Sequence, residues 1–199
     1  MPETIFARVL FFSEAVTLAH LVRPLALAEA LAAAGCEVHF ASAYRFETLF
    51  KDKPSLCYWP IESISYDAFI SSVSGERSAY NDEQVASYIA EEEALIRDVI
   101  PDLIVSDARL SLSVTAPALG IPLVNLNNAY WSPHRADKQD PVPNYKRSAL
   151  YRLLPPGLAE LFFPFPVVKV LHRVMKPLYE KRFLAPFNRA RRRRGLRPF

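Results

Sequence analysis

Short apolar runs alternate with helical patterns up to residue 126 of the chain. The apolar runs predict buried strands, and they lie at residues 7–12, 37–42, 56–61, 103–106 and 122–126. Between them, apolar residues that recur every three or four positions predict helices at residues 21–34, 44–51, 82–99 and 110–119. Apolar strands that alternate with helices are typical of a parallel sheet covered on both faces. The sequence therefore predicts an α/β, Rossmann-like domain.

Beyond residue 130 the pattern changes, because prolines interrupt it and no further strand is predicted. Two helices are predicted in this part of the chain, at residues 146–153 and 167–194. We therefore expect a Rossmann-like domain over residues 1–135. A Pro-rich and basic helical extension over residues 136–199 is expected to pack on it.

Composition indicates a folded protein that needs no disulfides. The chain has 199 residues, of which 51% are hydrophobic, and this excludes disordered, collagen-like and coiled-coil proteins. Cys36 and Cys57 are too few for a disulfide framework and belong to no Cys/His cluster, so no metal site is expected and a reduced cytosol is the simpler location. The N-terminus lacks the pattern of a signal peptide. Prolines and asparagines interrupt the longest uncharged stretch, residues 110–133, which excludes a membrane span there.

Charge is divided unevenly along the chain. The net charge of +3 is the sum of +10 for residues 151–199 and −7 for residues 1–150. The densest basic stretch, residues 189–197, is able to neutralise phosphates of nucleic acid or anionic lipid, or to complement a helix dipole as a solvated helix end. No aromatic-interleaved basic strand or zinc-finger spacing accompanies it, so no nucleic-acid partner is expected.

The loop after the first predicted strand contains the first candidate for chemistry. In a parallel sheet, ligands bind beyond the carboxyl ends of the strands. Residues 13–20 include no glycine, so the GxGxxG turn of NAD and FAD sites is absent and no cofactor is expected. His20 begins the next helix, where its imidazole either takes a proton from a bound hydroxyl or has a capping or packing role.

Asp107, the second candidate, ends the fourth predicted strand. In the strand order 3-2-1-4-5, strands one and four are neighbours, so Asp107 is expected beside the loop that leads to His20. A carboxylate there orients an imidazole, or it caps the next helix. No GxSxG elbow supplies a serine nucleophile. The pair therefore suits a base that activates a hydroxyl of the substrate.

Several segments resemble one enzyme family. They are residues 8–12, 20–31, 34–41, 101–107 and 116–124, together with Asn188-Arg189 and residues 191–196. These segments are similar to the N-terminal, acceptor-binding domain of GT-B glycosyltransferases, in the UDP-glycosyltransferase-like group that includes macrolide, flavonoid and glycolipid transferases. In that family the first loop is glycine-rich and its histidine lies three residues before a proline, whereas His20 lies four before Pro24.

The resemblance implies a role for each candidate residue. His20 would deprotonate a hydroxyl acceptor, Asp107 would orient His20, and the hydroxyl would displace the nucleotide from a hexose with inversion. The same resemblance implies two groups of acceptor-binding residues. One is Phe12 and Glu14 at the first loop, and the other is Tyr130 and Trp131 after the fifth strand.

The resemblance also implies partners. In the family the nucleotide-sugar site lies mainly in a second Rossmann domain, which would begin after Phe199. We therefore expect the 199 residues to hold a small-molecule or lipid acceptor and to transfer no sugar alone, with the donor supplied by a C-terminal domain or a partner chain. The alternative is a non-catalytic binding subunit or an orphan binding domain. The apolar segment 158–171 either contacts the inner face of a membrane or packs under the second domain.

Overall fold

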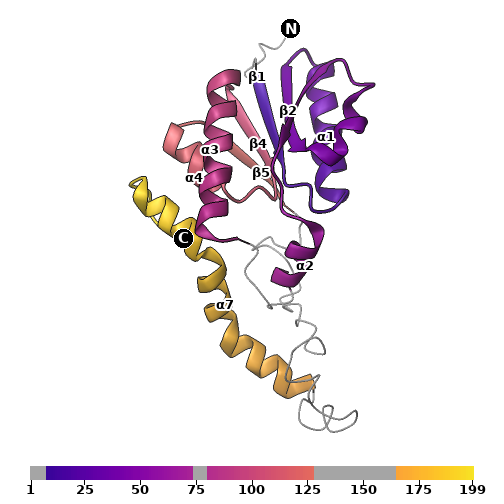
Figure 1. Cartoon of the computed structure of the whole chain (residues 1–199). Coiled ribbons are helices and arrows are strands. Elements are labelled where there is room, and N and C mark those ends of the chain that lie inside the picture. Colours follow the sequence, from indigo (N-terminus) through magenta and orange to yellow (C-terminus); the bar gives the residue numbers. More distant parts are fainter. Residues whose placement is uncertain (1–7, 74–79, 128–164) are drawn as a thin grey trace.

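A parallel five-stranded sheet forms the centre of the computed structural model, which describes residues 8–73, 80–127 and 165–199 (Figure 1). The strands are β1 (Arg8–Ser13), β2 (Glu37–Ala43), β3 (Leu56–Ile61), β4 (Leu103–Asp107) and β5 (Leu123–Leu126). Their order in the sheet is β3-β2-β1-β4-β5, and every neighbouring pair is parallel. This confirms the predicted Rossmann-like sheet and its strand order.

Helices cover both faces of this sheet, as predicted (Figure 1). They are α1 (Ala19–Ala33), the 3₁₀ helix η1 (Tyr44–Phe50), α2 (Tyr66–Val73), α3 (Asp82–Val99), α4 (Leu112–Leu119) and α7 (Phe165–Arg193). The sequence pattern missed α2, and the segment predicted as a helix at residues 44–51 forms a 3₁₀ helix instead. The helix predicted at residues 146–153 lies outside the described residues.

Alternate side chains of each strand enter different halves of the core. Val9 and Phe11 of β1 pack with α1 in one apolar cluster. Leu10 and Phe12 of the same strand pack with α3 and α4 in a second cluster. The two-residue period of a strand therefore buries β1 on both faces, which explains why its sequence is a continuous apolar run.

The ends of α3 fix the start of β4. Asn81 caps the helix, because its side-chain oxygen accepts a hydrogen bond of 2.7 Å from the backbone N–H of Gln84. At the other end, Ile100 adopts a left-handed conformation with a φ of 50°, and Pro101 follows it. The chain turns there into β4, which ends at Asp107.

The basic helix α7 packs against α3 and α4 (Figure 1). Phe187 is buried at 1% exposure in a third apolar cluster, which includes residues of α3. Arg189 pairs with Asp82, Arg194 pairs with Glu93, and Arg191 donates to the backbone carbonyl of Ser113. Three arginines of the basic stretch therefore bind the domain itself. Within the described residues, no helix has the length and apolar character needed to cross a membrane.

Candidate active site

His20 and Asp107 meet at the carboxyl edge of the sheet. Asp107 is the last residue of β4 and lies opposite Ser13, the last residue of β1. His20 lies in the first turn of α1, and its Nδ1 is 2.8 Å from Oδ1 of Asp107. The Asp107 side chain is 1% exposed and that of His20 is 21% exposed. The structure therefore brings the two predicted residues into one hydrogen-bonded pair, with the histidine nearer to solvent.

Arg23 is a third member of this site that sequence reasoning missed. Its Nε lies 2.9 Å from Oδ2 of Asp107, and its Nη2 lies 2.7 Å from the same oxygen and 2.9 Å from Oδ1. Such a two-pronged contact between a guanidinium and a carboxylate is strong and fixes the orientation of both groups. The available signal was spacing, because a residue three positions after His20 lies on the same face of a helix.

The contacts of Asp107 determine which nitrogen of His20 holds the proton. A carboxylate bound by a guanidinium is ionised and only accepts hydrogen bonds. Nδ1 of His20 must therefore be the N–H that donates to Oδ1, which leaves Nε2 without a proton in the neutral ring. In the neutral ring, Nε2 is therefore the nitrogen able to accept a hydrogen bond.

Backbone contacts hold the two loops of the site together. The N–H of Glu14 donates a hydrogen bond of 2.9 Å to the carbonyl of Asp107, so the chain leaving β1 stays beside the end of β4. The guanidinium of Arg45, in η1, donates to the carbonyl of Ala15 in the same loop. The loop thus has a fixed path without the glycines of the resembling family.

Phe12 and Glu14, predicted to bind the acceptor, lie inside the protein. Phe12 is 0% exposed and Glu14 is 1% exposed. One carboxylate oxygen of Glu14 accepts hydrogen bonds from Ser63 Oγ at 2.6 Å and the Ile64 N–H at 2.9 Å. Its other oxygen lies 3.1 Å from Nη1 of Arg109. These partners occupy both oxygens of the Glu14 carboxylate, so the side chain is turned into the protein in this structure.

Arg109 is the centre of a buried charge cluster behind the site. Besides Glu14, its guanidinium contacts Glu92 at 2.8 Å and Glu91 at 3.1 Å, and it lies 3.6 Å from the centre of the Tyr88 ring. Burial raises the pKa of Glu92 and also that of Glu91, which is partly buried. The Arg109 guanidinium thus forms ion pairs with three carboxyl groups. These ion pairs connect α3 to the loops after β1 and β4.

Tyr130 and Trp131, the other two predicted acceptor-binding residues, lie outside the described residues. His39, in β2, has a structural environment, because Trp59 Nε1 donates to its Nδ1 at 3.0 Å and its Nε2 lies 2.9 Å from Glu37. The hydrogen bond from His39 lowers the pKa of Glu37. No set of three or more His, Cys, Asp or Glu side chains within the described ranges is arranged to hold a metal ion.

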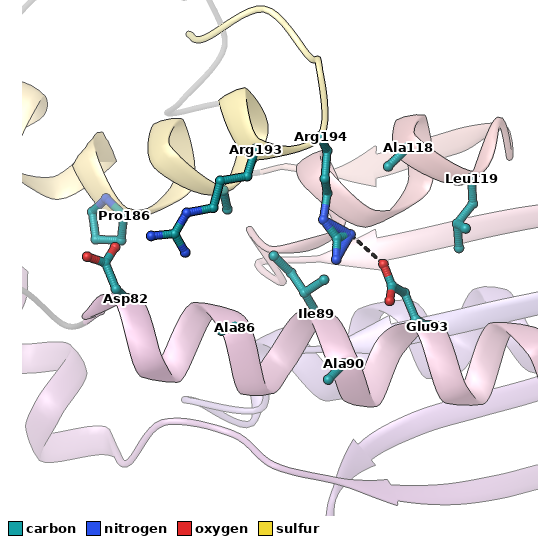
Figure 2. Close-up of a pocket in the computed structure, with 11 residues that line it drawn as sticks. Asp82, Ala86, Ile89, Ala90, Glu93, Ala118, Leu119, Pro186, Arg193 and Arg194 are labelled. Atoms are coloured by element: carbon teal, nitrogen blue, oxygen red, sulfur yellow. Dashed lines mark hydrogen bonds and ion pairs between the residues drawn. The ribbon is translucent and has the colours of Figure 1, made fainter.

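A cavity of about 640 Å³ lies between α3, α4 and α7 (Figure 2). Its apolar side includes Ile89 and Leu119. Arg193, the last residue of α7, and Arg194, which follows it, extend over the cavity (Figure 2). Arg194 pairs there with Glu93. None of the residues that line it belongs to the dyad or to its loops. The cavity therefore belongs to the contact between α7 and the domain.

Comparisons with known proteins give relatives along nearly the whole chain. Over 189 residues, or 95% of the chain, the sequence is 35% identical to an inactive PGL/p-HBAD biosynthesis glycosyltransferase of Mycobacterium bovis BCG, of which it covers 48%. The same identity and chain coverage relate it to a PGL/p-HBAD biosynthesis glycosyltransferase of Mycobacterium tuberculosis H37Ra, of which it covers 41%. A PGL/p-HBAD biosynthesis rhamnosyltransferase of Mycobacterium bovis BCG is 36% identical over 189 residues, with 39% covered.

The chain thus spans less than half the length of these relatives. Among solved structures, the glycosyltransferase SsfS6 of Streptomyces sp. SF2575 matches 60% of this chain and 38% of its own, with 20% identity and a TM-score of 0.47. No family model matches the chain.

Proposed function

Because this chain is a homologue of the PGL/p-HBAD biosynthesis glycosyltransferases along 95% of its length, we propose that it is the acceptor-activating part of an inverting glycosyltransferase. The acceptor is a small molecule or a lipid with a free hydroxyl, and the donor is a nucleotide-activated hexose. His20 is the proposed base and Asp107 the residue that orients it. The donor is bound by a C-terminal domain or by a partner chain.

The proposed step transfers one proton and one glycosyl group. Nε2 of His20 takes the proton of the acceptor hydroxyl while the hydroxyl oxygen attacks the anomeric carbon of the sugar. The bond from that carbon to the nucleotide oxygen breaks, and the nucleoside diphosphate leaves with the electron pair. Asp107 stabilises the imidazolium that forms, because its carboxylate accepts the hydrogen bond from Nδ1. Attack opposite the leaving group inverts the anomeric carbon.

The observation that carries this proposal is the 2.8 Å contact between Nδ1 of His20 and Oδ1 of Asp107. Homology alone does not decide between a working and a silent transferase, since one of the relatives is named inactive. The contact, in contrast, favours a specific tautomer, because with Nδ1 donating to the Asp107 carboxylate the neutral ring has its unprotonated nitrogen at Nε2. This tautomer is the one required of a base that acts on a hydroxyl.

Exposed apolar side chains near the dyad suggest the character of the acceptor. Leu18 and Val22 flank His20 in the sequence and are 56% and 50% exposed. Tyr44 and Tyr66 follow β2 and β3 at the same edge of the sheet, and both are more than half exposed. Exposed apolar side chains at this edge suit an acceptor with an apolar or aromatic body. Peripheral contact with a membrane is one route by which a lipid acceptor would reach this edge.

Transfer by the complete enzyme tests the proposal. The chain is combined with the donor-binding part found by sequencing the DNA downstream of the Phe199 codon, and UDP-glucose and dTDP-rhamnose are offered with phenolic and aliphatic alcohols. We expect the His20→Ala variant to lose at least about 100-fold in rate, in the range expected for a general base. His39→Gln is the matched control, because His39 is held by Glu37 and Trp59 away from the dyad. Transfer that survives in His20→Ala would overturn the role of His20.

A non-catalytic acceptor-binding subunit is the second candidate, and the inactive relative favours it. A complete assembly of this kind would bind an acceptor yet transfer no sugar with either donor. Binding of acceptor alcohols to the chain, measured by calorimetry, combined with absence of transfer in the complete assembly, would support this candidate. Transfer that depends on His20 would exclude it.

A further inference from the structure

Arg23 occupies the position from which a side chain can control the charge state of the dyad. It lies three residues after His20 in α1 and is 37% exposed, whereas the Asp107 carboxylate that it contacts is 1% exposed. We propose that Arg23 is a positioning residue that keeps the Asp107 carboxylate turned toward His20 and its charge compensated, so that the imidazole remains a neutral base. This inference rests on the proposed function, because it concerns the same base.

The first part of the argument is geometric. A guanidinium and a carboxylate that share two parallel contacts lie in nearly one plane, so Arg23 limits rotation of the Asp107 carboxyl group. Oδ1 then stays within 2.8 Å of Nδ1 of His20. Nη2 of Arg23 and Nδ1 of His20 share this oxygen. Without Arg23 the carboxyl group would be free to turn, and the preference of His20 for a protonated Nδ1 would weaken.

The second part of the argument is electrostatic. Asp107 and Arg23 together have no net charge, so a neutral His20 completes a neutral group of three. Without Arg23, an uncompensated negative charge would lie beside the ring, and this would favour the imidazolium. An imidazolium has no free Nε2 to receive a proton. The guanidinium therefore keeps His20 available as a base at neutral pH.

Among the described residues, the other charged groups near His20 contribute less to its state. Arg45 of η1 donates to the carbonyl of Ala15 and thereby faces the loop that precedes His20. Glu14, in the same loop, is compensated by Arg109 within the buried cluster. From β4 the group that contacts the ring is Asp107, and from α1 it is the helix N-terminus together with Arg23 on the shared carboxylate. Within the part of the chain that the structure describes, Arg23 is thus the charged side chain whose removal changes the charge balance at Asp107 most directly.

Nuclear magnetic resonance of the 199-residue chain tests this without any transfer reaction. Long-range ¹H–¹⁵N spectra report the protonation state of each imidazole, and the His20 signals are assigned by their loss in His20→Gln. In the wild type we expect a neutral ring with the proton on Nδ1 at pH 7. In Arg23→Gln the His20 ring should titrate about one pH unit higher or more, as expected when an opposite charge is no longer compensated. The same midpoint in both proteins would overturn the inference.

Two further variants separate charge from geometry. Arg23→Lys keeps the positive charge but cannot make two parallel bonds, so the titration midpoint should stay near that of the wild type while the neutral ring becomes a mixture of tautomers. Arg97→Gln removes an exposed arginine of α3 and should change neither signal. If Arg23→Gln does not fold, the tautomer ratio in Arg23→Lys decides, and an unchanged ratio there would overturn the inference.

The complete enzyme supplies an independent readout. Arg23→Gln should lower kcat, leave the KM for the acceptor unchanged and move the acidic limb of the pH–rate profile to higher pH. A protein that transfers no sugar would contradict the proposed function, yet the ring titrations of the isolated chain would still decide the role of Arg23. The two proposals therefore fail in distinguishable ways.

Discussion

The hydroxyl of Ser13 donates a hydrogen bond of 2.6 Å to the backbone carbonyl of His20. In a regular helix this carbonyl would accept from the N–H four residues later, but that residue is Pro24, which has no N–H. Ser13 is 0% exposed, so its side chain replaces the missing helical bond from inside the protein. Pro24 removes one backbone hydrogen bond from α1, and the Ser13 hydroxyl at the end of β1 replaces it. This compensation fixes the turn on which His20 lies.

A double-mutant cycle measures the coupling between Ser13 and Pro24. Ser13→Ala leaves the carbonyl of His20 without a donor in a largely buried place, and we expect the free energy of unfolding to fall by about 1–3 kcal/mol. Pro24→Ala restores the N–H, so Ser13→Ala should cost less in that background, with a coupling of at least about 0.5 kcal/mol. Urea denaturation of the four proteins gives the coupling. Equal costs of Ser13→Ala in both backgrounds would contradict the compensation.

Asp107→Asn tests the carboxylate itself. The amide oxygen can accept from His20 or Arg23 but cannot receive the two-pronged contact of the guanidinium, and the amide NH₂ faces a donor. We expect the free energy of unfolding to fall by about 1–3 kcal/mol, the range for lost hydrogen bonds to charged groups. Transfer by the complete enzyme should fall by at least about 100-fold.

The control for this variant is Asp102→Asn. Asp102 is exposed and accepts a hydrogen bond of 2.8 Å from the backbone N–H of Arg8 through Oδ2. An amide oxygen can accept the same bond, so we expect a change within about 0.5 kcal/mol. An equal loss of stability in both variants would mean that the charge of the buried Asp107 stabilises the fold no more than that of the exposed Asp102.

The sequence predicted the meeting of His20 and Asp107, because strand order alone brings the ends of β1 and β4 together. It did not predict the burial of Glu14. The partner of Glu14 is Arg109, which lies 95 residues away in the chain and follows Ala108, whose φ of 59° turns the backbone after β4. No local pattern encodes such a pairing. Strand order brings Glu14 and Arg109 to the same edge of the sheet, but it does not show that the Glu14 carboxylate turns into the protein, where Arg109 and the loop after β3 bind it.

Glu92 makes the stability of this buried cluster depend on pH. Burial raises its pKa above the ordinary value of 4.5, so between 4.5 and the raised value the folded protein binds more protons than the unfolded chain. The contribution of Glu92 to stability is therefore fully present below pH 4.5 and is lost as the pH rises through the folded-state pKa.

Glu92→Gln removes this titration, and its amide still offers an oxygen to Arg109 and Ser111 and an NH₂ group to the hydroxyl oxygen of Thr115. The stability difference between variant and wild type should therefore shift in favour of the variant as the pH rises from 4.5 to 7.5. Urea midpoints at several pH values within this range measure the shift. A difference that stays constant with pH would show that Glu92 does not titrate there. Glu83→Gln, on the same helix but outside the cluster, is the control.

Phe187 is expected to attach α7 to the rest of the domain. Its ring is 1% exposed and meets Tyr80 edge to face at 5.1 Å between centroids, whereas Val174 of the same helix is 65% exposed. Phe187→Ala removes a buried aromatic ring, a change that costs about 3–5 kcal/mol. Because α7 contacts α3 and α4 without entering the sheet, part of this cost should appear as local detachment. Trypsin should then cleave residues 189–194 faster in Phe187→Ala, while Val174→Ala retains the wild-type rate. Equal cleavage rates in all three proteins would show that Phe187 does not hold the helix in place.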